Sequence, residues 1–296
     1  MESKSTQTPL VVIVGETASG KTAAAIEVAK RVNGEIICAD SRTVYKKMDI
    51  GTAKPSLQEQ QSIPHHLINI VEPNEIFSVA RFQELANKCI QEVAGRGRVP
   101  VVVGGTGLYV DALLYNFQFS DEVDTTLRAS LEQMNDEELT TLLNTKNIDT
   151  DLLNTKNRRH VIRAIERGGA PKFRQKLREN TVVLGITLER DELRSRVAER
   201  VDLMFENGFL EEARQLLEVY GPVESLKTPG YNAVGRYLKG EINESELKST
   251  FVQSDMKLAK RQRTWFKRSS DIDWFVDSSR LVEAAVAFVN QTRDLV

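Results

Sequence analysis

A phosphate-binding motif near the N-terminus restricts the fold of this chain more than any other sequence feature. Residues 15–22 read GETASGKT and fit the pattern G-x-x-x-x-G-K-[ST]. The β-branched run LVVIV (10–14) precedes the motif, and the Ala-rich segment TAAAIEVAKRV (22–32) follows it. A strand, this loop and a helix in that order allow the loop amides and the helix N-terminus to surround a diphosphate.

The motif therefore predicts a diphosphate site, and residues 15–22 are called the phosphate loop below. We expect Lys21 to supply positive charge to the phosphates and Thr22 to offer a hydroxyl ligand to Mg²⁺. The pattern is specific for phosphate binding but leaves the reaction open. The residues expected to bind the diphosphate are Gly15, Thr17, Ala18, Ser19, Gly20, Lys21 and Thr22.

The rest of the chain predicts an α/β fold, with a P-loop core built on a mostly parallel sheet and a helical insertion. Residues 78–95 have helical spacing, with Ser78 as the expected N-cap and Gly95 as the expected stop. Alternation of such helices with buried strands is typical of doubly wound domains. Further apolar runs that read as strands occupy residues 35–39, 66–70, 99–105, 181–188 and 273–276.

The pattern changes between Asp121 and Arg178, where only polar, helix-like segments occur. We therefore expect a P-loop core formed by residues 1–116 and 180–296, interrupted by a helical insertion domain at 117–179.

Two basic segments stand out in a chain whose formal net charge is −2. Residues 156–178 hold nine Lys or Arg and one acid, and residues 256–268 hold six Lys or Arg and no acid. Such segments either face a polyanion or form solvated helix faces. The N-terminus is polar and no 18-residue apolar run occurs, so we expect a cytoplasmic protein with no membrane partner.

The position of the acid that would act beside the phosphate loop is unusual. A nucleotide hydrolase places an acid after a later strand, but the strand at 99–103 is followed by GGTGLY. Asp40 instead ends the strand at 35–39, on the side where α/β proteins bind ligands. It could hold a metal, accept a proton from a nucleophile or cap a helix. Thr106 could contact an anion or act as an N-cap.

Six motifs in the order found here resemble those of the tRNA dimethylallyltransferases, also called tRNA isopentenyltransferases. The resemblance extends from about residue 10 to residue 268, and it implies transfer of a dimethylallyl group from dimethylallyl diphosphate to tRNA. The acceptor would be the exocyclic amine of the adenine 3′ of the anticodon, and diphosphate would be released. The motifs are GETASGKT, ADSRTVYKKMDIGTAKP, VPVVVGGTGLY, RRHVIRAIE, ERVDLMFENGFLEEA and LAKRQRTWF.

The resemblance also implies roles for individual residues. Asp40 matches the general base, Arg200 an arginine that reaches the diphosphate, and Thr106 a hydroxyl contact near the donor. The insertion would contact the tRNA anticodon stem-loop, Mg²⁺ would assist the diphosphate, and one chain is expected to act as a monomer. The residues implied to contact tRNA are Asp40, Ser41, Arg42, Thr43, Arg128, Arg159, His160, Arg163, Lys260, Arg261, Gln262 and Arg263.

Several positions depart from the family pattern, among them Asn232, which stands after Gly-Tyr where an acidic residue or Gln is usual. Glu16 stands where proline is usual, which puts an acid in the phosphate loop; we expect its side chain to point outward. Thr43 replaces a common Gln in the segment implied to read the adenine, and His160 stands where Arg is frequent.

Two other reactions and one non-catalytic function are consistent with parts of the sequence. A P-loop kinase of small molecules would use Asp40 to activate a hydroxyl and the insertion as a lid. A prenyltransferase of free adenine nucleotides would not require two distant basic segments. A non-catalytic RNA-binding module would leave the complete phosphate loop unexplained.

Overall fold

The computed structural model describes residues 8–119, 125–148, 150, 155, 157–166, 168 and 176–294. The chain divides into two compact units, one made of Met1–Tyr115 and Leu177–Val296 and the other of Asn116–Lys176. The predicted insertion at 117–179 extends three residues further at its C-terminal end. Arg178 belongs with the first unit, because its backbone N–H donates to Leu114 O at 3.0 Å and its Nη1 to Asn87 Oδ1 at 2.8 Å.

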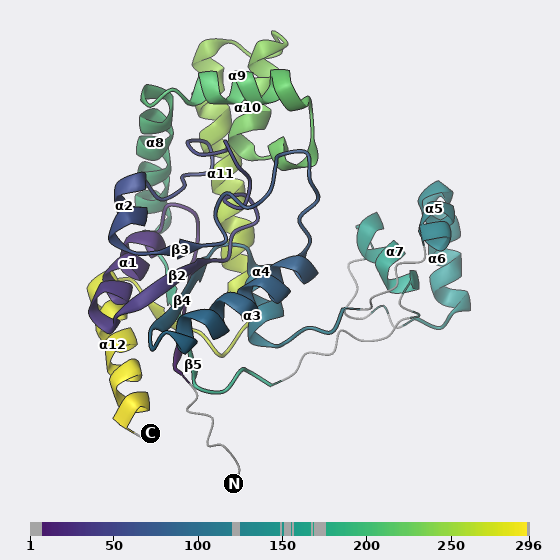
Figure 1. Cartoon of the computed structure of the whole chain (residues 1–296). Coiled ribbons are helices and arrows are strands. Elements are labelled where there is room, and N and C mark those ends of the chain that lie inside the picture. The colour runs from purple at the N-terminus through teal and green to yellow at the C-terminus, as the bar shows by residue number, and fades with distance from the viewer. Residues whose placement is uncertain are drawn as a thin grey trace. The chain divides into compact units, whose positions relative to one another are not determined.

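The first unit is built on a parallel sheet, which confirms the predicted α/β fold (Figure 1). The strand order is β3-β2-β4-β1-β5-β6, and each neighbouring pair is parallel. The strands are β1 Leu10–Gly15, β2 Gly34–Cys38, β3 His65–His66, β4 Val99–Gly104, β5 Thr181–Ile186 and β6 Asp273–Phe275.

The third predicted strand, at 66–70, is wrong for most of its length. Only His65 and His66 pair with β2. Leu67 and Asn69 have φ angles of 62° and 55°, and this left-handed backbone interrupts an extended strand. The apolar run is nevertheless folded inward, since Leu67 is buried.

Helices cover the sheet and bury its hydrophobic strands. The helix α1 (Lys21–Val32) packs against α12 (Ser278–Asp294), and together with the strands they enclose one core. The helix α3 (Val79–Gly95) packs on β2 and β4 and contacts α4 (Gly107–Leu114). The predicted cap of α3 is confirmed, because Ser78 Oγ accepts from Arg81 N at 3.1 Å.

A second group of helices lies above the sheet as drawn in Figure 1. It consists of α8 (Arg190–Glu206), α9 (Phe209–Tyr220), α10 (Pro229–Leu238) and α11 (Glu244–Phe266), with η1 (Glu224–Leu226) between α9 and α10. The helix α11 reaches back to the sheet, because it contacts β1 and α4 as well as α8 and α10. The short helix α2 (Leu57–Ser62) precedes β3.

The segment that follows β2 is attached firmly to this helical group. The Glu212 carboxylate of α9 accepts the backbone N–H groups of Asp49, Ile50 and Gly51 at 2.8–2.9 Å. Gly51 is required there, because a Cβ atom would lie 2.2 Å from the Phe209 ring. These contacts fix the chain between the end of β2 and α2.

The second unit contains α5 (Thr125–Gln133), α6 (Asp136–Thr145) and α7 (Arg158–Glu166). Leucine and isoleucine side chains from these helices form its small core. Asn135 and Glu138 form a capping box at the start of α6. The helical character predicted for the insertion is therefore present in its described residues.

No helix in the described ranges of either unit is long and apolar enough to cross a membrane.

A buried carboxylate joins β2 to the loop that precedes β4. Glu35 is 3% exposed and accepts two hydrogen bonds from Arg96, at 3.2 and 2.7 Å. His66 Nε2 lies 2.6 Å from Glu35 Oε2, and Arg98 Nη1 lies 3.3 Å from Oε1. Burial acts to raise the pKa of Glu35, but the hydrogen bonds from Arg96 and His66 outweigh it and the pKa is lowered.

Glu35→Gln is expected to lower the free energy of unfolding at neutral pH by about 1.5–3 kcal/mol, the usual value of hydrogen bonds to a charged group. Because the folded-state pKa is lowered, the wild-type contribution exists above the unfolded-state pKa and disappears as the pH falls through the folded-state pKa. Urea unfolding at neutral and acidic pH tests this: the gap between the two proteins should close in acid. Glu84→Gln, at an exposed acid of α3, is the control. A gap that persists in acid would contradict an electrostatic origin.

Candidate active site

The phosphate loop connects β1 to α1 through a tight backbone path. Gly20 precedes α1 with φ 91°, and Ala18 has φ 61°. Gly15 lies so close to β5 that a Cβ atom there would be 2.5 Å from Ile186 O. Lys21 Nζ donates to Glu16 O at 3.1 Å, which folds the lysine back over the loop. The loop therefore has the compact form expected of a diphosphate cradle.

Asp40 lies two residues beyond β2, at the edge of the sheet from which the loop also emerges. Its Oδ1 accepts from Arg42 N at 2.8 Å and from Thr43 N at 3.4 Å. Asp40 thus caps the turn that follows β2 and does not cap a helix. The side chain is partly exposed, and its charge is close enough to Lys21 to influence the pKa of that lysine.

Thr106 lies beside the Asp40 segment because the ends of β2 and β4 are in close contact. A Cβ atom at Gly104 would be 2.0 Å from Ala39 O, so only glycine permits this approach. Thr106 Oγ1 accepts from Ser41 N at 3.0 Å and makes no side-chain cap to α4. Thr106 therefore occupies the N-cap position of α4, as one interpretation predicted, but its hydroxyl makes no cap and faces the segment that carries Asp40.

Arg200 reaches the phosphate loop from α8. Its Nη1 donates to Thr17 Oγ1 at 2.7 Å, and its Nη2 donates to the Asp255 carboxylate of α11. Asp255 is 4% exposed. Burial raises the pKa of Asp255, and the positive charge of Arg200 opposes this shift. Asp255 holds the guanidinium of Arg200 against the loop.

Two consecutive residues of α11 also contact the phosphate loop. Gln262 Oε1 accepts from Thr17 N at 2.8 Å, and its Nε2 donates to Gly105 O at 3.0 Å. Arg263 forms an ion pair with Glu16 through Nε and donates to Leu188 O at 2.6 Å through Nη2. The expectation that Glu16 points outward is wrong: it is 1% exposed and points toward α11.

The other residues implied to read the adenine occupy different environments. Arg42 Nη1 donates to the carbonyls of Glu224 and Ser225, each at 3.2 Å. Thr43 is 7% exposed, so its side chain lies inside the fold and not on a surface. Ser41 is partly exposed beside Thr106. The structure therefore brings Asp40 and Ser41 to Thr106, whereas Arg42 bridges toward η1.

The residues of α11 implied to contact tRNA divide between two faces. Lys260 and Arg261 are exposed, whereas Gln262 is 9% exposed and Arg263 is half-buried. Trp265 packs within the first unit, where its Nε1 donates to Asp111 Oδ2 at 3.0 Å. Only Lys260 and Arg261 of this group are placed to attract a polyanion from solvent.

Within the second unit, α5 and α7 carry the remaining cations of the prediction. Arg128 forms a bidentate pair with Glu166, with both N–O distances 2.6 Å. Arg159, His160 and Arg163 lie at exposed positions of α7. The exposed basic side chains of the prediction thus lie along α7, whereas Arg128 of α5 is held by Glu166.

The described residues contain no group of three or more His, Cys, Asp or Glu side chains arranged to hold a metal ion. Mg²⁺ commonly binds through one or two protein oxygens together with substrate phosphates and water. Thr22 in the first turn of α1 offers a hydroxyl oxygen, a donor of the right type. The donor set therefore fits Mg²⁺ when a diphosphate is present.

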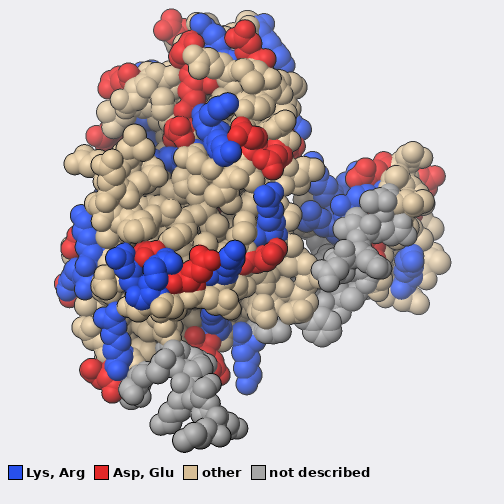
Figure 2. Space-filling model, viewed as in Figure 1, with Lys and Arg blue, Asp and Glu red and all other residues tan. Residues whose placement is uncertain are grey.

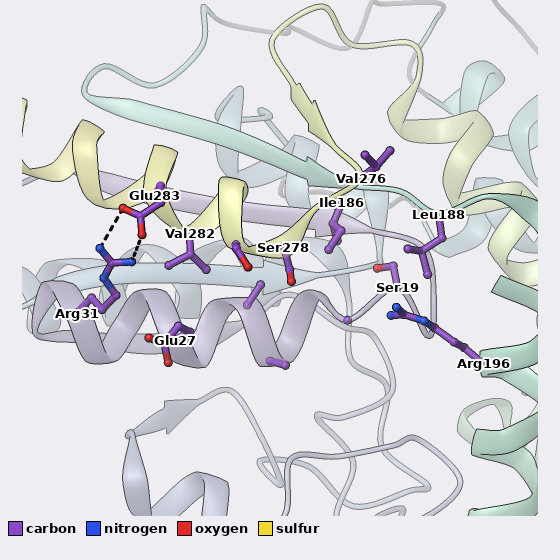
Figure 3. A pocket seen from close by; sticks show the side chains of 14 residues that line it. Ser19, Glu27, Arg31, Ile186, Leu188, Arg196, Val276, Ser278, Val282 and Glu283 are labelled. Atoms are coloured by element: carbon purple, nitrogen blue, oxygen red, sulfur yellow. Dashed lines mark hydrogen bonds and ion pairs between the residues drawn. The ribbon is translucent and has the colours of Figure 1, made fainter. Parts of the chain in front are cut away.

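A pocket of about 500 Å³ lies behind the phosphate loop, between α1, α12 and the end of β5. Figure 3 shows Ser19 and Arg196 at one end and the Arg31–Glu283 ion pair at the other. Its lining does not include Asp40, Thr106 or Arg200. The pocket therefore shares Ser19 and Gly20 with the phosphate loop but is not lined by the residues grouped around Asp40.

Comparison with known proteins identifies the group to which this arrangement belongs. The IPP transferase family model matches residues 43–269. A tRNA dimethylallyltransferase of Acetivibrio thermocellus is 42% identical over 283 residues, covering 90% of this chain and 90% of the relative. The enzyme of that description from Bacillus subtilis is 38% identical over 286 residues, covering 91% of each chain. The chain belongs to the tRNA dimethylallyltransferase family.

Solved structures place the fold in the tRNA dimethylallyltransferase family as well. A tRNA isopentenylpyrophosphate transferase from Bacillus halodurans has a TM-score of 0.75 and 37% identity, covering 98% of this chain and 99% of that chain. A eukaryotic dimethylallyltransferase acting on tRNA has a TM-score of 0.76 and 27% identity, covering 91% and 74%. The family resemblance drawn from the motifs is confirmed.

The sequence did not identify Asp255 as part of the candidate site. The available signal was its position: Asp255, Ala259 and Gln262 recur at helical spacing on the buried face of α11. A carboxylate on such a face requires a partner. The identity of that partner, Arg200 on another helix, was not predictable from spacing alone.

Proposed function

We propose that this chain transfers a dimethylallyl group from dimethylallyl diphosphate to the exocyclic amine of the adenine 3′ of the anticodon in tRNA. The observation that carries the proposal is the arrangement at one edge of the sheet. Asp40 and Thr106 lie beside a phosphate loop that contains Lys21 and is contacted by Arg200. The arrangement offers a proton acceptor on one side and a diphosphate site on the other.

In the proposed reaction, the lone pair of the adenine amine attacks C1 of the dimethylallyl group as the C1–O bond to diphosphate breaks. The bonding electrons leave with the diphosphate oxygen, and the amine proton passes to the Asp40 carboxylate. The amine is a weak nucleophile because its lone pair is delocalised into the ring, so removal of the proton prevents accumulation of positive charge. The hydrogen bonds to Asp40 Oδ1 orient the carboxylate for this role.

The leaving diphosphate requires positive charge that is already in place. Lys21, the loop amides and the Arg200 guanidinium would supply it, and Thr106 would contact the donor. Mg²⁺, held by Thr22 together with the diphosphate, would add further positive charge to the leaving group. Thr17 would support the loop indirectly, because its amide N–H donates to Gln262 and its hydroxyl accepts from Arg200.

Each unit, taken by itself, carries exposed cations that would bind tRNA phosphates. The target adenine must leave the stacked anticodon loop to reach the donor, and exposed Lys and Arg side chains would bind the phosphates around it. Lys260 and Arg261 of α11 and Arg159 and Arg163 of α7 are the exposed cations among the predicted contacts. We further propose that the reaction takes place in the cytoplasm and that the chain acts as a monomer.

The affinity for the donor is expected to fall as the pH rises through about 8. Burial lowers the pKa of Lys21 to about 8, while the charge of Asp40 acts to raise it. Lys21 is charged below this pKa and loses its charge above it, so kcat/KM for the donor should fall about tenfold per pH unit beyond the break. A bound diphosphate favours the charged amine, so the corresponding break in kcat should lie at higher pH.

The pH profile of Lys21→Arg is the control, because a guanidinium stays charged throughout this range. Its kcat/KM should lack the break near pH 8, whatever its absolute value. An unchanged break in this variant would assign the titration to another group.

The direct test is incubation of the full chain with labelled dimethylallyl diphosphate, Mg²⁺ and an unmodified anticodon stem-loop. Mass analysis of the digested product should locate one dimethylallyl group on the adenine 3′ of the anticodon. Parallel reactions with free AMP, and with ATP in place of the donor, test the two alternative enzymes. Prenylation of AMP but not of the stem-loop, or phosphorylation by ATP without prenyl transfer, would overturn the proposal.

A further inference from the structure

The phosphate loop contains an acid that opposes the binding of an anion. Glu16 is the second residue of the loop and is 1% exposed. Its Oε1 pairs with Arg263 Nε and accepts from the Thr187 hydroxyl at 3.3 Å. Among the described residues, Oε2 is buried with no hydrogen-bond partner. The Glu16 carboxylate is thus buried from water, and its ion-pair partner among the described residues is Arg263.

The charge of Glu16 affects the lysine of the same loop. Burial lowers the pKa of Lys21, and Glu16 is among the charges that act on it in the opposite direction. Lys21 Nζ also donates to the backbone carbonyl of Glu16 at 3.1 Å. An uncompensated carboxylate here would repel a diphosphate and compete with it for the positive charge of Lys21.

Arg263 is anchored where it can cancel this charge. Its Nε contacts Glu16, and its Nη2 donates to Leu188 O at 2.6 Å, just beyond β5. The Arg263 side chain is 29% exposed, whereas Lys260 and Arg261, within the same turn of α11, are exposed. The guanidinium of Arg263 is therefore directed at the loop, away from the face that carries its neighbours.

We propose that Arg263 is a positioning residue for the donor, which neutralises Glu16 and fixes the phosphate loop to α11 so that the loop can accept a diphosphate. The inference rests on the proposed function only for the identity of the anion. It assigns Arg263 to the donor side of the reaction, whereas the sequence resemblance places it among the tRNA contacts.

The test is a double-mutant cycle on diphosphate affinity, measured by calorimetry with inorganic diphosphate and Mg²⁺ on the full chain. Arg263→Met should weaken binding by roughly tenfold to a hundredfold, the effect of one uncompensated charge a few ångströms from an anion in a partly buried site. Glu16→Gln combined with Arg263→Met removes both charges and should restore affinity to within about threefold of wild type. Arg263→Lys, which keeps the charge, should lie between wild type and Arg263→Met.

Arg261→Met is the matched control, because Arg261 is exposed on the same helix. It should weaken binding of the anticodon stem-loop and reduce its salt dependence while leaving diphosphate affinity unchanged. Arg263→Met should show the reverse pattern. Thermal unfolding of each variant accompanies the cycle, so that a loss of fold is separated from a loss of binding.

Two results would overturn the inference: no rescue by Glu16→Gln in a folded double variant, or an Arg263→Met variant that loses stem-loop affinity but keeps diphosphate affinity. Neither result depends on prenyl transfer. If the variants give the expected diphosphate affinities but the wild-type protein transfers no dimethylallyl group, the proposed function is rejected and the role of Arg263 stands.

Discussion

Asp40→Asn is expected to lower kcat for prenyl transfer by about 10²–10⁴-fold, the usual contribution of a positioned general base. Asparagine retains the oxygen that accepts from Arg42 N and Thr43 N, so the turn after β2 should persist. It cannot accept the amine proton at neutral pH. The Kd for an unmodified stem-loop should therefore change little, and so should KM for the donor when it is measured at acidic pH, where Lys21 stays charged without Asp40; single-turnover kinetics and a binding titration will separate these quantities.

Asp277 provides a matched control for this substitution. Its Oδ1 accepts from Ser279 N at 2.8 Å, which repeats the turn contact of Asp40 at an exposed site. Asp277→Asn should leave kcat unchanged. Turnover retained by Asp40→Asn would remove Asp40 from the role of base. Loss of stem-loop binding at full kcat would make it a recognition residue instead.

The sequence predicted where the phosphate loop and Asp40 lie, because local rules determine these positions. The phosphate loop must follow a strand and begin a helix, and β1 and α1 do so at Gly15 and Lys21. Asp40 lies next to Thr106 because the carboxyl ends of parallel strands meet at one edge of the sheet. The contact between Ala39 and Gly104 brings these ends together more tightly than strand order alone implies.

The sequence did not predict the directions of polar side chains on α11. The motif LAKRQRTWF is basic throughout, but Lys260 and Arg261 face solvent whereas Gln262 and Arg263 bind the phosphate loop. Helical spacing identifies which residues share a face. It does not show that the buried face of α11 meets a loop nearly 250 residues earlier in the chain, because that contact depends on tertiary packing.

The dependence on tertiary packing also explains why the sequence wrongly predicted that the Glu16 side chain points outward. An acid in a loop is normally solvated, and nothing near it in sequence suggested a buried partner. The structure places Arg263 against it from α11, which converts an unfavourable charge into an ion pair. Backbone conformation also escaped prediction. The apolar run at 66–70 predicted a strand, but the positive φ angles of Leu67 and Asn69 interrupt that strand.

Arg200→Gln is expected to lower kcat by about 10²–10³-fold, the effect of removing one preorganised donor to a developing negative charge. It also leaves Asp255 buried without its cation, which is strongly destabilising, by about 3–5 kcal/mol. Asp255→Asn in the same chain removes that second effect. The double variant should therefore regain much of the lost unfolding free energy but not the lost kcat, as denaturant unfolding and steady-state kinetics will show.

This divergence between stability and activity is what distinguishes a residue that contacts the diphosphate from one that only supports the fold. If Arg200 were solely structural, the double variant would recover both quantities together. Asp255→Asn alone keeps the Arg200 guanidinium and its contact with Thr17 Oγ1, so it should raise KM for the donor more than it lowers kcat. Arg194→Gln, at an exposed position of α8, controls for loss of charge on that helix. Equal losses in Arg194→Gln and Arg200→Gln would reduce the role of Arg200 to a general electrostatic one.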